Sequence, residues 1–186
     1  MDIILLILQS IYFAIPAYLA NMAPVIVKKY RFLESLNKPI DQNMIFVDKK
    51  PLFGSHKTYR GLFVAILFGI LAAYLQRLLL QIPFFSRISI LDYSNPLLIG
   101  FLLGLGAILG DLIKSFFKRR VSIQPGKKFI PFDQIDFIIG AFLLAWPFYH
   151  SVITISVFIV SVAASFCLHI IVNHTAYFLK IRKERW

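Results

Sequence analysis

Apolar runs of membrane length dominate this chain of 186 residues. About 20 apolar residues cross the hydrocarbon core of a bilayer as a helix. Hydrophobic residues make up 59% of the sequence, and the mean hydropathy of +0.75 excludes an ordinary soluble domain. The length suits one membrane-embedded domain over residues 1–186. We therefore predict an all-α integral membrane protein with five transmembrane helices, at residues 3–27, 61–80, 96–117, 135–149 and 152–179.

The distribution of lysine and arginine predicts how these spans are oriented. Residues 28–60 hold eight of the 20 basic residues, residues 114–128 hold six and the tail from Lys180 holds four. Because basic residues concentrate in cytoplasmic loops, we expect a cell-membrane protein with an external N-terminus and cytoplasmic loops at 28–60 and 118–134. The same rule explains the net charge of +11, so no nucleic acid is expected as a partner. No basic residue precedes the first run, which favours a span over a cleaved signal peptide.

Ionisable residues gather where the third run meets the cytoplasm. Four of them recur at spacings that share one helix face: Asp111, Lys114, Ser115 and Lys118. Such groups are costly near hydrocarbon and usually mark function. An ion pair between Asp111 and Lys114 that only neutralises charge is the alternative. Arg119 and Arg120 add more positive charge than one carboxylate explains, which favours an anionic ligand such as a polyphosphate.

Two further carboxylates, Asp133 and Asp136, stand three residues apart at the start of the fourth run. They share one helix face on the same side of the membrane as Asp111. The alternative for Asp133 is that it only caps the helix. This alternative is less favoured for Asp136, which lies one turn deeper. Two or three such carboxylates could hold Mg²⁺ while substrate phosphates fill its remaining positions.

Two glycine-containing patterns accompany these charges. The segment Gly54-Ser-His-Lys57-Thr58-Tyr-Arg60-Gly61 combines glycine, hydroxyls and cations before the second run. It has the composition of a phosphate-binding loop, without a Walker A pattern. The third run contains four glycines at spacings that favour close helix packing: Gly100, Gly104, Gly106 and Gly110. The alternative is that they leave space for a ligand beside Asp111.

Taken in order, these segments make the chain resemble the CDP-archaeol synthase family, membrane cytidylyltransferases that act on ether-lipid phosphates. The resemblance covers nearly the whole length. It rests on Ala20-Asn21-Met-Ala-Pro24, Gly54-x-x-Lys57-Thr58-x-Arg60-Gly61, Gly110-Asp111-x-x-Lys114-Ser115-Phe-x-Lys118-Arg119, Pro125-Gly126, Pro131-Phe-Asp133-Gln134-x-Asp136 and Asn173 with a basic tail ending in tryptophan. The central stretch is also similar to phosphatidate cytidylyltransferases, but Gln134 stands where their signature has arginine. That departure favours the archaeal type.

The resemblance implies an activity and a site. CMP would pass from CTP to 2,3-bis-O-geranylgeranylglycerol 1-phosphate, giving CDP-archaeol and pyrophosphate, with Mg²⁺ as cofactor and the bilayer supplying the lipid. Catalytic roles are implied for Asp111, Lys114, Ser115, Lys118, Arg119, Asp133 and Asp136, the three aspartates binding the metal. Substrate-binding roles are implied for Asn21, Gly54, Lys57, Thr58, Arg60, Arg120, Lys127, Gln134 and Asn173.

Three other functions remain as alternatives. A phosphatidate cytidylyltransferase would make CDP-diacylglycerol by the same chemistry. An alcohol-phosphate transferase would need a longer run of four spaced aspartates, which this sequence lacks. A small transporter or structural membrane protein would be expected to show an inverted repeat or carboxylates at the midplane of the membrane.

Overall fold

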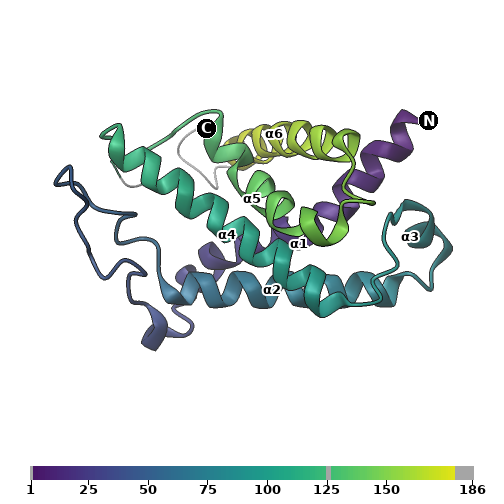
Figure 1. Ribbon diagram of the computed structural model, residues 1–186, viewed down its shortest axis with the longest axis horizontal. Coiled ribbons are helices and arrows are strands. Elements are labelled where there is room, and N and C mark those ends of the chain that lie inside the picture. The colour runs from purple at the N-terminus through teal and green to yellow at the C-terminus, as the bar shows by residue number, and fades with distance from the viewer. Residues whose placement is uncertain (1, 125–126, 179–186) are drawn as a thin grey trace.

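The computed structural model describes residues 2–124 and 127–178, and this part of the chain is helical (Figure 1). It contains six α-helices and one short 3₁₀-helix: α1 (Ile3–Lys29), η1 (Glu34–Leu36), α2 (Tyr59–Leu79), α3 (Pro83–Ile88), α4 (Pro96–Arg120), α5 (Phe132–Tyr149) and α6 (Ile155–Phe178). Within residues 2–124 and 127–178, the β-structure consists of two isolated bridges. The predicted all-α class is confirmed.

Three of these helices, α1, α2 and α4, are long and apolar enough to cross a membrane, each with a window of mean hydropathy 2.1. Helices α5 and α6 coincide with the fourth and fifth apolar runs. The predicted limits need one correction, because α4 continues to Arg120 and α5 begins at Phe132. Residues 118–120 and 132–134 are therefore helical, although they were expected in the loop 118–134.

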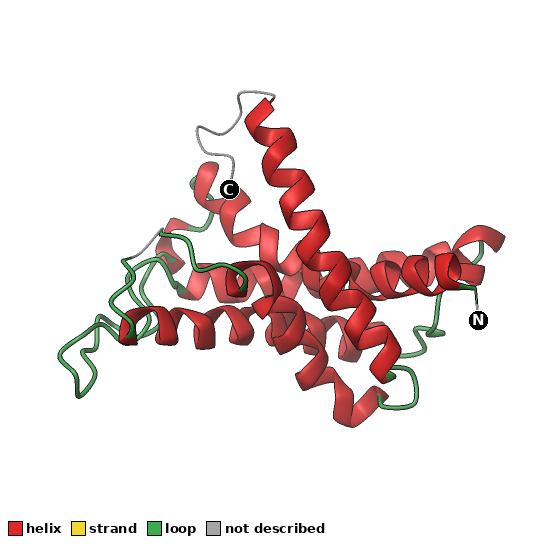
Figure 2. Cartoon of the chain, turned by 90° about the horizontal axis from the view of Figure 1, so that it is seen from above, coloured by secondary structure: helices red, strands yellow, loops and turns green. Residues whose placement is uncertain are grey.

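Helix α4 lies at the centre of the molecule and packs against α1, α2 and α5 (Figure 1). Its buried Leu103 belongs to a core that also includes Phe13 of α1 and Phe142 of α5. The rings of Phe13 and Phe142 meet edge to face, with centroids 5.4 Å apart. Helix α6 packs against α1 and α5 and then diverges from the bundle (Figure 2). Helix α4 is thus held by three neighbouring helices.

The glycines of α4 lie at its crossings with other helices. A Cβ atom on Gly100 would lie 2.7 Å from the carbonyl oxygen of Gly69 in α2. One on Gly110 would lie 2.2 Å from the carbonyl oxygen of Asp136 in α5. Such close backbone approach confirms the packing interpretation of the glycine pattern. It also fixes the end of α4, where Asp111 lies, against the start of α5.

The segment 30–58 between α1 and α2 forms an ordered loop beside the C-terminal end of α4 (Figure 1). Its organising residue is Asp41, which is 1% exposed and accepts N–H hydrogen bonds from Phe53 at 2.9 Å, Gly54 at 3.1 Å and Asn43 at 3.1 Å. Burial alone would raise the pKa of Asp41, but these N–H donors hold the pKa below its ordinary value. The loop therefore has a fixed shape, which no motif in the sequence indicated.

Candidate active site

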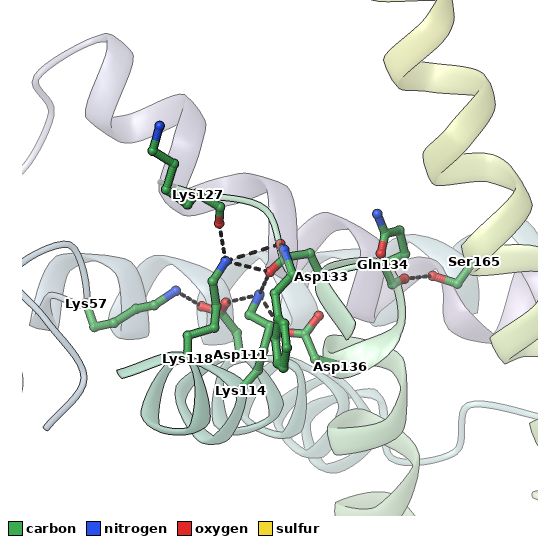
Figure 3. Close-up of polar contacts among 10 residues, drawn as sticks. Lys57, Asp111, Lys114, Lys118, Lys127, Asp133, Gln134, Asp136 and Ser165 are labelled. Carbon is green, nitrogen blue, oxygen red and sulfur yellow. Dashed lines mark hydrogen bonds and ion pairs between the residues drawn. The ribbon is translucent and has the colours of Figure 1, made fainter. Parts of the chain in front are cut away.

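The three predicted carboxylates come together around one ammonium group, that of Lys114 (Figure 3). Its Nζ atom lies 3.0 Å from Asp111, 3.0 Å from Asp133 and 2.9 Å from Asp136. Asp111 is one turn earlier on α4, whereas the other two project from the first turns of α5. The glycine crossing of α4 and α5 brings these two helix ends close enough for one side chain to contact all three carboxylates.

Two more lysines complete the cluster. Lys57 of the 30–58 loop pairs with Asp111, and Lys118 lies 3.1 Å from Asp133. Three ammonium groups therefore balance three carboxylates in a place where the Lys114 side chain is only 13% exposed. The Asp111–Lys114 pair exists, as the alternative interpretation expects, but within this larger network. Balanced charge lowers the cost of keeping these groups at the membrane edge.

Asp133 does not cap α5 in the way the alternative interpretation expects. The N-cap position belongs to Pro131, which makes no side-chain capping bond. The Asp133 carboxylate instead accepts the backbone N–H of Phe129 at 2.6 Å, and this bond holds the turn that leads into α5. Asp133 thus fixes the backbone at Phe129 while it contacts Lys114 and Lys118.

The cluster has the donor chemistry of a Mg²⁺ site but not the arrangement of one. Carboxylate oxygens are suitable ligands for Mg²⁺. Within residues 2–124 and 127–178, however, no group of three or more His, Cys, Asp or Glu side chains is arranged to hold a metal ion. The ammonium of Lys114 lies among the three carboxylates instead (Figure 3). Metal binding by these aspartates stays a prediction.

A small cavity of about 100 Å³ lies between the 30–58 loop and α4. Gly54, at a backbone φ of 102° that favours glycine, forms part of the loop wall. The α4 wall includes Ser115, Lys118 and Arg119, each less than a tenth exposed. The Nε atom of Arg119 is buried without a hydrogen-bond partner among the described residues. This concentration of donors suits an anionic group such as phosphate.

A second cavity, of about 330 Å³, opens between α1, α2 and α4. One part of its wall is apolar and includes Val25, Ile108 and Leu112. The other part is polar: Asn21, Lys28, Lys57, Thr58 and Asp111. A cavity with an apolar wall beside two lysines suits an amphiphile with an anionic head group.

His56 is the site residue that the motifs did not single out. It lines both of these cavities and also a third, of about 540 Å³, whose wall includes Arg31, Glu34 and Arg60. Burial lowers the pKa of His56, and the positive charges of Lys28, Lys57 and Arg119 lower it further. The imidazole therefore stays neutral at physiological pH and can accept a hydrogen bond where the cavities meet.

Two predicted phosphate-binding arginines are engaged elsewhere. Arg60 is 4% exposed and pairs with Glu34 at 2.6 Å, while its other nitrogen donates to the side-chain oxygen of Asn37 at 3.0 Å. Arg120 contacts Phe46 and Asp48 of the 30–58 loop. The structure thus shows the protein partners of these two arginines, and their roles in substrate binding stay predictions.

The remaining predicted residues lie around the edge of the cluster. Lys127 contributes its carbonyl oxygen, which accepts a hydrogen bond from Lys118, while its own side chain points away (Figure 3). Gln134 is 5% exposed, and its backbone carbonyl accepts a hydrogen bond from Ser165 of α6 at 2.8 Å. Thr58 caps α2 by accepting the N–H of Gly61 at 3.2 Å. The side chain of Asn173 and the pair Pro125-Gly126 lie outside what the structure describes.

Comparison with known proteins decides the family. The family model described as CarS-like, CDP-archaeol synthase, matches residues 3–186. This chain belongs to the CDP-archaeol synthase family. A CDP-archaeol synthase of Methanococcus maripaludis (strain C5) is 37% identical over 188 residues, with both chains fully covered. One from Pyrobaculum islandicum is 33% identical over 171 residues, covering 92% of this chain and 93% of that protein.

A solved structure shares the fold of this CDP-archaeol synthase family member. It is described as "Structural insight into an intramembrane enzyme for archaeal membrane lipids biosynthesis", and it aligns with a TM-score of 0.69 at 28% identity. The alignment covers 90% of this chain and 94% of the solved chain. The predicted resemblance and the predicted function, CDP-archaeol synthesis, are thereby confirmed. The chain is a multi-pass integral membrane protein.

Proposed function

We propose that this chain transfers CMP from CTP to 2,3-bis-O-geranylgeranylglycerol 1-phosphate, giving CDP-archaeol and pyrophosphate. Membership of the CDP-archaeol synthase family supports the two substrates. The observation that carries the proposal is the juxtaposition of a cation-lined cavity and an amphiphilic cavity at one end of the helices. His56 and Lys57 line both cavities, so a ligand in either one comes close to the same two side chains.

The two cavities fit the two substrates differently. The cavity between the loop and α4 suits the triphosphate of CTP, because Ser115, Lys118 and Arg119 offer hydrogen-bond donors and positive charge there. The cavity between α1, α2 and α4 suits the lipid phosphate, with Lys28 and Lys57 toward the phosphate and the apolar wall toward the prenyl chains. In this arrangement Lys57 lies between the two reacting phosphates.

The reaction then needs no nucleophile from the protein. A phosphate oxygen of the lipid attacks the α-phosphorus of CTP, the bond from that phosphorus to the oxygen bridging to the β-phosphate breaks, and pyrophosphate leaves with the bond electrons. The chain contributes positioning and charge neutralisation, the main sources of rate in phosphoryl transfer. Lys28, Lys57, Lys114 and Lys118 line the two cavities and would stabilise the charge on the phosphates.

Magnesium is part of the proposal. Asp111, Asp133 and Asp136 would hold it, with substrate phosphates as further oxygen ligands. When bound, Mg²⁺ would neutralise charge on the phosphates of CTP. Their shared contacts with Lys114 bring the three carboxylates together, and its ammonium would have to move toward the phosphates for the metal to bind.

The enzymatic test uses purified protein in detergent with CTP labelled in the α-phosphate. We expect label to appear in a CDP-lipid only when Mg²⁺ and a lipid phosphate are both present. Geranylgeranylglycerol phosphate should be a better substrate than phosphatidic acid. Efficient use of phosphatidic acid alone would favour the diacylglycerol alternative. Folded protein that forms no CDP-lipid from either substrate would disprove the proposal.

The proposed topology has five spans, an external N-terminus and an active site that faces the cytoplasm. The distribution of basic residues supports this topology, since the cluster is flanked by the two loops richest in lysine and arginine. In a variant in which Cys167 is replaced by serine, we expect a membrane-impermeant thiol reagent to label Asp2→Cys in intact cells. Glu184→Cys should be labelled only after the cells are lysed. Labelling at position 184 from outside would contradict the five-span topology.

A further inference from the structure

Arg120, at the end of α4, holds a segment of the cytoplasmic loop through two aromatic rings. Its guanidinium carbon lies 4.7 Å from the ring centroid of Phe46 in the loop and 4.6 Å from that of Phe116 in α4. Its Nε atom lies 3.1 Å from a carboxylate oxygen of Asp48. Its Nη2 atom donates to the carbonyl oxygen of Pro51. Stacking, an ion pair and a hydrogen bond thus converge on one side chain.

The loop segment held in this way is a hairpin of residues 44–52, closed by the bridge between Ile45 and Pro51. It makes a reciprocal contact with the end of α4. Lys50 of the hairpin donates to the carbonyl oxygen of Arg120 at 2.8 Å and to the hydroxyl of Ser122 at 2.7 Å. The hairpin and the end of α4 are therefore joined in both directions.

The hairpin leads directly into a wall of the candidate site. Phe53 and Gly54 follow it, and their N–H groups are fixed by buried Asp41. His56 and Lys57 come next, and Lys57 pairs with Asp111. The cavity of about 100 Å³ is the space between this part of the loop and α4. Its width therefore depends on how firmly the loop is held at the hairpin.

We propose that Arg120 is a positioning residue for cytidylyl transfer. It acts through the hairpin, by fixing the distance between the loop and α4, rather than by contacting a phosphate. This inference rests on the proposed function, because it assumes that the cavity between loop and α4 receives the phosphates of CTP. It also assigns a role to Phe46, a partly exposed residue of the loop.

The chemistry of arginine makes this role distinguishable from phosphate binding. A guanidinium is planar, so it stacks on two rings while its N–H groups donate hydrogen bonds at its edge. A lysine ammonium is a point charge, which can bind phosphate but cannot stack and donate in this way. Substituting lysine at position 120 therefore separates the two roles. It keeps the positive charge that a phosphate ligand needs. It loses the planar group that holds the hairpin against the end of α4, an arrangement called the clamp below.

The test compares Arg120→Lys, Phe46→Ala and the double variant in the CTP assay. Misplacement of a substrate by about 1 Å can cost roughly 100-fold in rate, so we expect kcat/KM for CTP to fall by about that factor in each single variant. The KM for the lipid phosphate should stay close to wild type. The double variant should be no worse than either single variant, because both changes release the same contact.

The control is Lys49→Gln, which removes a cation from the same hairpin without touching the clamp, and it should keep wild-type kinetics. Wild-type behaviour of Arg120→Lys, or of Phe46→Ala, would overturn the proposal. So would a double variant whose loss is the product of the two single losses.

Limited digestion with trypsin gives a readout that does not depend on activity. We expect Arg120→Lys and Phe46→Ala to be cleaved after Lys49 faster than wild type, while their melting temperatures stay close to the wild-type value. Unchanged cleavage rates in both variants would show that Arg120 does not hold the hairpin. If the variants were cleaved faster but the wild-type protein showed no CMP transfer, the contact between Arg120 and the hairpin would be supported. Only the proposed function would then be disproved.

Discussion

Asp136→Asn is expected to reduce turnover by about 100- to 1,000-fold, the loss typical of removing one preorganised charged or polar group from an active site. The substitution keeps the size of the side chain and removes a negative charge that lies 2.9 Å from Lys114. The protein should remain folded, because Lys114 keeps its contacts with Asp111 and Asp133. Activity at increasing Mg²⁺ concentration, measured beside the melting temperature, is the test. Asp133→Asn should behave in the same way.

A matched control is Asp92→Asn, the same chemical change in the loop before α4, where the side chain accepts the N–H of Ser94. It should leave turnover unchanged. If Asp136 had only a structural role, Asp136→Asn would lower the melting temperature, and the surviving folded protein would keep wild-type specific activity. Normal turnover with an unchanged Mg²⁺ requirement would remove Asp136 from the site.

Gly110→Ala is expected to destabilise the protein by about 3 kcal/mol, at the upper end for overpacking, because the obstacle is backbone rather than a flexible side chain. The new Cβ would lie 2.2 Å from the carbonyl oxygen of Asp136 and 3.2 Å from the Cα atom of Gly140. Helices α4 and α5 would have to separate at the level of the carboxylate cluster. We therefore expect a lower melting temperature in detergent together with a loss of activity.

Gly61→Ala is the matched control for this prediction. Its Cβ would meet Pro24 at 3.4 Å and the Thr58 hydroxyl at 3.6 Å, close to ordinary van der Waals distances. Alanine also favours a helix more than glycine does, so the melting temperature should stay the same or rise. A melting temperature of Gly110→Ala equal to that of wild type would mean that the α4–α5 crossing can adjust.

Local spacing was sufficient to predict the carboxylate cluster. Asp111 and Lys114 share a helix face, as do Asp133 and Asp136, and the apolar runs indicate the helices that carry them, although α4 and α5 extend three residues beyond the predicted limits. The convergence of the two helix ends was also foreseeable, because both were expected on the same side of the membrane. The glycines that hold these ends together were predicted as packing residues.

The loop could not be predicted in this way, because its structure depends on contacts between distant residues. Asp41 is a single carboxylate without a motif, and its role appears only when Phe53 and Gly54 fold back onto it. Arg60 and Arg120 have the charge and setting of phosphate ligands in the sequence, yet Glu34 and the hairpin engage them. Positive charge predicts affinity for phosphate, but it does not predict which carboxylate or aromatic ring of the folded protein lies beside the arginine.

The tip of the hairpin offers a place from which events at the site can be followed. Val47 is 91% exposed, while its neighbours Phe46 and Asp48 both contact Arg120. A fluorophore attached at position 47, in protein without Cys167, would therefore stay in solvent and still be coupled rigidly to the end of α4. Its anisotropy would report the tightness of the loop during each stage of the catalytic cycle, without a label inside the membrane or in either substrate cavity.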